Sequence, residues 1–174
     1  DKNNFAIIHF GKKQSNISIF NNLSFVYSEN FDFGTDIIMK DVSKVCSLSF
    51  ENVKKIFFEM DFDEIKQKAT EEKYLDKKFF VENNFRKISI NLLNEIINAR
   101  VEELINLILK KNINLKISNE KIETTYFSFD DLNFIDIFKQ KFLKTNSDKM
   151  LIKFEEKTQD EQSTSCLISA ELIG

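Results

Sequence analysis

The stretch FAIIHFGKKQSNISIF, residues 5–20, decides the fold because two apolar runs flank a short polar turn. The runs FAIIHF and ISIF are rich in β-branched and aromatic residues, so they predict the two strands of a hairpin. Gly11 opens the turn, and Lys12 and Lys13 follow it directly. A phosphate-binding hairpin would place small residues and a carboxylate here, because phosphate needs close backbone approach. The stretch therefore predicts a sheet and leaves open what its turn does.

Patterns downstream of this hairpin predict an α/β fold. The run LSFVYSENF alternates like a third strand, and the turn signal NN before it predicts a second hairpin. Apolar spacing near 3.6 then predicts helices at 36–45 and 50–60. Later strands are predicted in KIETTYFSF and KMLIKF, and later helices in DDLNFIDIFKQKFL and TSCLISAELIG. Either Asp130 or Asp131 can cap the first of these two helices.

The most regular pattern is a long helix predicted over residues 90–111. Its apolar residues recur on one face at helical spacing: Leu93, Ile97, Val101, Leu104 and Ile108. Ser89 stands where it can cap the start of this helix, as Ser49 does for the helix at 50–60. Before it, KKFFVENN, residues 77–84, predicts a short strand. This element order predicts an α/β core with an inserted second lobe.

Composition limits the classes of function. The chain has 174 residues, of which 30% are charged, and a net charge of -3, so it can bury a core and carries no basic footprint for nucleic acid. No apolar run approaches the roughly 18 residues of a membrane span, and the first residues are polar, which favours a cytoplasmic protein. Cys46 and Cys166 lack metal-ligand spacing, and His9 is the single histidine. We therefore expect buried free cysteines and no metal site.

Glycine is the informative count, because the chain has 3 where average usage would give about 12. Backbone that approaches a phosphate closely needs glycine, so such places are few. Phenylalanine reaches 19 residues, while proline and tryptophan are absent. We interpret this bias as the source of a Phe, Ile and Leu core and not as an aromatic binding surface.

Three stretches resemble the C-terminal half of the bacterial cell-division family FtsA, a branch of the actin and Hsp70 ATPase superfamily. IIHFGKKQSNISIF is similar to the family pattern L-I-D-I-G-G-G-T-T-D-I-A-V-F, and FDFGTDIIMKDV is similar to V-P-V-G-G-D-x-I-T-x-D-I-A. The most specific match is LLNEIINARVEELINLIL, which resembles the family helix L-A-E-I-I-E-A-R-V-E-E-I. The resemblance implies an RNase H-like, actin-like ATPase fold: a mixed five-stranded sheet flanked by helices, with an inserted smaller α+β lobe.

The resemblance also implies a division into subdomains. Residues 1–58 and 117–174 would form subdomain 2A, the RNase H-like core, and residues 59–116 would form the inserted subdomain 2B. The family's subdomains 1A and 1C, and its amphipathic membrane-binding tail, have no counterpart in the matched stretches. The implied location is the cytoplasm, at the inner face of the membrane at the division site, with membrane contact only through such a tail.

The family's phosphate hairpin is degenerate in this chain. The family holds magnesium through an Asp and cradles the phosphates of ATP with Gly-Gly-Thr backbone and hydroxyl groups. The corresponding positions here are His9, Gly11, Lys12, Lys13, Gln14 and Ser15. Lysine side chains would obstruct the backbone approach, although a lysine could offer phosphate a point charge. Since the hairpin has no carboxylate for Mg²⁺, we expect that ATP and magnesium binding are lost and that the chain is not an enzyme.

The family's adenosine loop has also lost its glycines in this chain. Its pattern L-T-G-G-G-A-x-L-x-G-L is similar in position to TYFSFDDLNFI, which puts Phe127, Ser128 and Phe129 on the three consecutive glycines. Aromatic rings would then fill the space where adenine and the α-phosphate approach the chain. Two altered loops together predict a scaffold without a cofactor.

The leading hypothesis is a cell-division scaffold that binds the C-terminal tail of FtsZ or other divisome proteins and is able to form homo-oligomers. In the family the long helix contributes an R-x-x-E pair to the FtsZ-tail site, and Arg100 and Glu103 match it. These side chains are i,i+3 neighbours, so an exposed intrahelical ion pair is the alternative interpretation. Two other functions stay open: an actin-like scaffold of type IV pilus assembly, and an active ATPase or sugar-kinase relative.

Overall fold

The first three strands form an antiparallel meander. The computed structural model describes residues 4–60, 65, 73–80, 85–110, 112, 122–145 and 151–154. In it, β1 (Phe5–Phe10) pairs with β2 (Ser15–Asn21), and β2 pairs with β3 (Ser24–Phe31). Asn22 and Leu23 join β2 to β3 with positive φ angles of 50° and 64°, as a two-residue hairpin turn requires. The meander is therefore the one predicted by the opening stretch together with the run LSFVYSENF that follows it.

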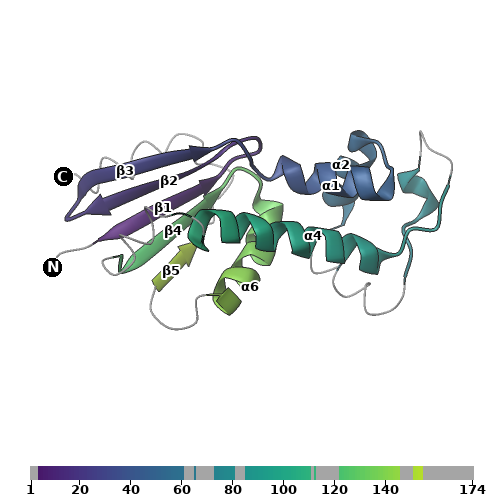
Figure 1. Ribbon diagram of the computed structural model, residues 1–174. Helices are drawn as coiled ribbons and strands as arrows, with labels where there is room; N and C mark the ends of the chain where they lie inside the picture. Colours follow the sequence, from purple (N-terminus) through teal and green to yellow (C-terminus); the bar gives the residue numbers. More distant parts are fainter. Residues whose placement is uncertain are drawn as a thin grey trace.

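Two later strands extend the meander on the far side of β1. β4 (Thr124–Phe129) lies parallel to β1, and β5 (Leu151–Phe154) lies parallel to β4. The sheet order is β3-β2-β1-β4-β5 (Figure 1). The expectation of a mixed five-stranded sheet is confirmed. The predicted final helix, residues 164–174, lies outside the described residues.

Helices follow the strands in the expected order. They are α1 (Asp36–Cys46), α2 (Phe50–Glu59), α4 (Ile90–Ile105) and α6 (Ile135–Thr145), with short 3-10 turns η1 (Lys77–Phe79) and η3 (Leu132–Phe134). α4 continues into a wider π-type segment, η2 (Asn106–Lys110), so the long helix predicted over 90–111 changes geometry after Ile105. Figure 1 shows α1, α2 and α4 together at one end of the sheet.

One predicted strand is wrong in its described part. In KKFFVENN the structure has the 3-10 turn η1 at Lys77–Phe79 in place of a strand. Phe79 and Phe80 are both buried, so neighbouring apolar residues enter the core together. A strand sends neighbours to opposite faces, whereas a tight turn allows both to point inward.

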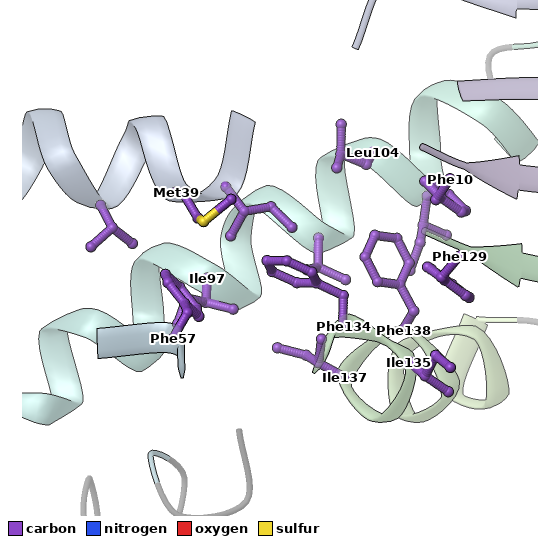
Figure 2. Close-up of a cluster of buried hydrophobic side chains, with 14 of the residues drawn as sticks. Phe10, Met39, Phe57, Ile97, Leu104, Phe129, Phe134, Ile135, Ile137 and Phe138 are labelled. Carbon is purple, nitrogen blue, oxygen red and sulfur yellow. The ribbon is translucent and has the colours of Figure 1, made fainter. Parts of the chain in front are cut away.

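The core lies between one face of the sheet and the helices. Phe10 of β1 stacks on Phe129 of β4, with ring centroids 5.2 Å apart, and Phe138 of α6 meets Phe10 at 4.5 Å. Figure 2 shows Phe138 next to Phe10 and Phe129 at the strand ends, and Phe134 on its other side, toward Phe57. Ring pairs at these separations add to the free energy gained from buried area. The expected Phe, Ile and Leu core is confirmed.

Candidate functional site

The β1–β2 turn, residues 11–14, is tied to the start of α1. The backbone N–H of Thr35 donates to the carbonyl of Gly11 at 3.0 Å, and the N–H of Asp36 donates to the carbonyl of Lys12 at 2.8 Å. Both N–H groups belong to the first turn of α1, where a helix otherwise offers free donors to an anion. In this chain those two donors are used to hold the turn.

Side chains of the turn are also engaged within the chain. Ser15 is buried, and its hydroxyl donates to the carbonyl of Phe33 at 2.8 Å. Gln14 donates through its amide to Asp32 at 3.3 Å. Lys12 and Lys13 are exposed, so these two side chains point to solvent while the polar groups around them bind one another.

The residues that align with the adenosine loop lie in a strand. Phe127, Ser128 and Phe129 belong to β4 and pair in register with Ile8, His9 and Phe10 of β1. The rings of Phe127 and Phe129 are buried in the core under α6, where Phe127 meets Phe142 at 4.1 Å. The loop after β4 therefore begins at Asp130. Its backbone N–H donates to the carbonyl of Phe10 at 3.0 Å.

A polar cluster joins the ends of β1 and β4. His9 Nδ1 lies 2.9 Å from Ser128 Oγ, and His9 Nε2 lies 3.5 Å from Asp130 Oδ1. Sequence reasoning treated His9 as an isolated residue and did not include Asp130 among the site residues. Parallel pairing of β1 with β4 sets His9 directly opposite Ser128. A carboxylate thus stands beside the hairpin, contributed by the loop that follows β4.

A second candidate site is a shallow groove between two helices, here named the α1–α4 groove. It has a volume of about 600 Å³ and is lined by Asp41, Lys44, Val45, Ile96, Ala99, Arg100 and Glu103. Val45, at 56% exposure, is one of its apolar lining residues, together with Ile96 and Ala99. Both predicted partner-binding residues, Arg100 and Glu103, therefore lie at this groove.

Arg100 links the two walls of the groove. Its Nε donates to Asp41 Oδ2 of α1, and its Nη1 donates to Glu103 Oε2 of α4 at 2.7 Å. The side chain is 24% exposed. The intrahelical pair with Glu103 that sequence spacing suggested is present, and the pair with Asp41 adds an interhelical contact. Lys44, by contrast, is exposed and has no ion pair with any carboxylate of the described residues.

Further expectations concern cysteine, metal and membrane. Cys46 is a buried free thiol, and burial raises its pKa, opposed by the nearby charge of Arg86; Cys166 lies outside the described residues. Within the described ranges, no three His, Cys, Asp or Glu side chains gather as a metal site would require. None of the described helices combines the length and the hydropathy of a membrane span.

Comparison with known proteins identifies the fold. No protein-family model and no curated protein matches the sequence. Among solved structures, apo ParM of psk41 is similar with a TM-score of 0.58 at 14% identity, covering 99% of this chain and 41% of ParM. The ethanolamine utilization protein EutJ from Carboxydothermus hydrogenoformans is similar with a TM-score of 0.55 at 9% identity, covering 87% of this chain and 44% of EutJ. MreB 5 of Spiroplasma citri, bound to AMPPNP, has a TM-score of 0.53 at 12% identity, covering 99% and 52%.

The chain has the actin-like ATPase fold. It spans less than half the length of ParM and EutJ. The expected fold is confirmed, while membership of the superfamily and the narrower resemblance to FtsA stay predictions. Identities this low establish the fold and do not transfer a ligand or a partner.

Proposed function

We propose that the chain is a non-enzymatic, actin-like scaffold of cell division, similar to FtsA, which docks the C-terminal tail of FtsZ in the α1–α4 groove. It acts on the cytoplasmic side of the membrane at the division site and works by protein contact. The α1–α4 groove carries this proposal. A short tail that is both acidic and apolar needs a hydrophobic seat and a cation close together, and the groove has both.

The hydrophobic seat is formed by apolar side chains that stay wholly or partly exposed to solvent in the folded chain. Val45 and Ala99 are exposed and Ile96 is partly buried, and all three line the groove. Apolar side chains gathered in a concave surface favour a partner because docking removes them from water.

The cation is supplied by Lys44 more directly than by Arg100. Two carboxylates already neutralise the guanidinium of Arg100, whereas Lys44 stands exposed at the same groove. Arg100 therefore holds α1 and α4 in position, and Lys44 is the open charge for an acidic peptide. An exposed cation of this kind contributes to the association rate and to specificity.

The turn between β1 and β2 supports a function without nucleotide. The first N–H groups of α1 are donated to Gly11 and Lys12, and the Ser15 hydroxyl is donated to Phe33. In the family's manner, ATP with magnesium would need hydroxyl groups of the hairpin free and a carboxylate on the hairpin, and an anion at the start of α1 would need its first N–H groups free. Two carboxylates from outside the hairpin lie beside it, and both are engaged: Asp130 faces His9, and Asp32 accepts from the Gln14 amide. The residues present do not fit ATP and magnesium in the family's manner.

The docking proposal is tested by fluorescence polarisation with a labelled FtsZ-tail peptide. We expect Val45→Asp to weaken binding by about tenfold or more, equivalent to about 1.4 kcal/mol, because a charge enters the apolar seat. Phe58→Asp is the matched control, since Phe58 is 88% exposed on α2 and is not part of the groove. Lack of binding by the unmodified chain, or equal binding by Val45→Asp, would refute docking in the groove.

The absence of nucleotide binding is tested separately by isothermal titration calorimetry with MgATP. We expect no saturable heat. A saturable signal that disappears in Asp130→Ala would overturn the non-enzymatic part of the proposal, and it would leave the docking test unaffected.

A further inference from the structure

The edge of the sheet at β3 is open in the part of the chain that the structure describes. β3 stands at the end of the order β3-β2-β1-β4-β5, and its only described partner is β2. The outer side of an edge strand presents unpaired N–H and C=O groups, which can template pairing with another strand. β3 has eight residues, whereas β5 at the opposite edge has four.

Composition leaves this edge unprotected. The strand reads SFVYSENF, so it has no lysine, arginine or proline to discourage pairing. Its single charge, Glu29, accepts from the Tyr27 hydroxyl and from the amide of Asn112, each at 2.8 Å. A shift in register between β2 and β3 affects Val26, but residues 27–31 keep a regular ladder that a second strand could extend.

The tip of the hairpin carries exposed apolar side chains. Leu23, Phe25 and Val26 are 51%, 63% and 56% exposed. Leu23 also has a φ of 64°, a conformation that favours glycine and costs a leucine roughly 1 kcal/mol or more. The two-residue turn accounts for this φ angle, whereas the exposed apolar side chains gathered at the tip are not explained by the turn. Their exposure points to a contact outside the chain.

We infer that β3 pairs antiparallel with β3 of a second copy of the chain, around a two-fold axis at Ser28. This register sets Tyr27 of each copy opposite Glu29 of the other. It places a hydroxyl donor against a carboxylate acceptor on one face of the joined sheet, twice. The two Glu29 side chains are then diagonal to each other and not directly opposite, which limits their repulsion.

A second copy fits this edge because the strand is complementary to itself. A two-fold axis makes a closed contact in which the same surface is used twice, so one strand must supply both donor and acceptor. Tyr27 and Glu29 do so within one copy already, at 2.8 Å. In this antiparallel register, Leu23 and Phe25 at the start of one β3 lie beside the end of β3 in the other copy. Apolar contact there would remove these two side chains from water.

The register is tested by cross-linking. Ser28→Cys places two thiols at the axis, and mild oxidation with dissolved oxygen and copper phenanthroline should join them into a disulfide dimer on a non-reducing gel. Ser18→Cys is the matched control, because Ser18 is the cross-strand neighbour of Ser28 on β2 and the two copies of it would lie about 14 Å apart, three strand spacings. The unmodified chain, which carries the same Cys46 and Cys166, sets the background.

Sedimentation velocity tests the association itself. The unmodified chain should shift from monomer to dimer as its concentration rises, and Ser28→Lys should stay monomeric with an unchanged thermal midpoint, because it places two lysines at the axis. A monomer at every concentration together with no Ser28→Cys cross-link would overturn the inference, whether the edge is covered by the chain's own residues or by a different protein. Equal cross-linking of Ser18→Cys and Ser28→Cys would also overturn it.

Discussion

At the scale of single residues, two of the three glycines stand where backbone segments meet. Gly11 begins the β1–β2 turn, and Gly34 precedes α1 against that turn. A Cβ built on Gly34 would lie 2.5 and 2.6 Å from the carbonyl carbon and oxygen of Lys12, and nearer still to the carbonyl oxygen of Gly11. No side chain fits at such distances. Glycine is needed here so that the turn can dock on the helix.

Gly34→Ala should therefore destabilise the fold. We expect a loss of about 1 to 3 kcal/mol in the free energy of unfolding, because the added methyl forces backbone apart. Chemical denaturation followed by circular dichroism measures it. Gln14→Ala is the control in the same turn, since it removes an exposed hydrogen bond and creates no clash. If the two variants were equally stable, close contact at Gly34 would not be the reason for the glycine.

At the scale of elements, the helix starts follow two different rules. Ser49 and Ser89 each accept a hydrogen bond from the backbone N–H three residues on, at 3.2 and 3.1 Å, so both predicted caps are confirmed. Thr35 begins α1 without such a bond, and its buried hydroxyl has no partner among the described residues. α1 starts where the β1–β2 turn accepts its first N–H groups. In α1, backbone carbonyls of the β1–β2 turn accept the first N–H groups, whereas in α2 and α4 a serine side chain accepts one.

Mutating the first residue of each kind of helix start should have different effects on the free energy of unfolding. Ser89→Ala should lower the free energy of unfolding by about 1 kcal/mol, since it leaves the Leu92 N–H without its acceptor. Thr35→Val should be neutral or slightly stabilising, because it replaces an unpaired buried hydroxyl with a methyl of similar shape. Thermal and urea unfolding of the two variants checks both. A larger loss for Thr35→Val would mean that its hydroxyl has a partner.

At the scale of the whole molecule, α6 joins the sheet to the helical end. Phe138 contacts Phe10 and Phe129 of the central strands at ring distances of 4.5 and 5.2 Å. Phe134, just before α6, contacts Phe57 of α2 at 5.7 Å, and Lys141 pairs with Glu102 of α4 at 3.2 Å. Together, η3 and α6 therefore pack on three separate parts of the fold, and Figure 2 shows the phenylalanines of two of these contacts.

Truncating this connection should affect the fold as a whole. Phe138→Ala should cost about 3 to 5 kcal/mol, the usual range for a buried phenylalanine, and should unfold the chain in a single transition. Phe58→Ala is the matched control, since Phe58 is almost fully exposed, and it should change stability by less than about 0.5 kcal/mol. Separate transitions of sheet and helices in Phe138→Ala would show that other contacts suffice to join them.

The sequence predicted the sheet well and the candidate site only in part. Strands and helix caps depend on neighbouring residues. The alternation in residues 5–31 was therefore sufficient to predict the meander, and the serines before α2 and α4 were sufficient to predict their caps. Phe127 and Phe129 were placed both in the predicted strand KIETTYFSF and on the glycines of the adenosine loop, and the structure has them in the strand, as their alternation with Thr125 favours. Asp130 was missed as a site residue because nothing near it in the chain indicates that His9, 121 positions away, is its neighbour.

By itself, the sequence determined most of the strands and helices and their order along the chain. It also showed that the chain has few glycines, and so few places where backbone can approach a phosphate closely. Hydrophobic periodicity and capping act over a few residues, so they can be read directly from the chain. Only the tertiary structure decided which distant groups meet: His9 with Ser128, Arg100 with Asp41, and the first N–H groups of α1 with the β1–β2 turn. These contacts form when whole elements pack at a particular register. Pairing partners that lie 59 or 119 residues apart leave no local pattern, because their proximity is a property of the packed fold.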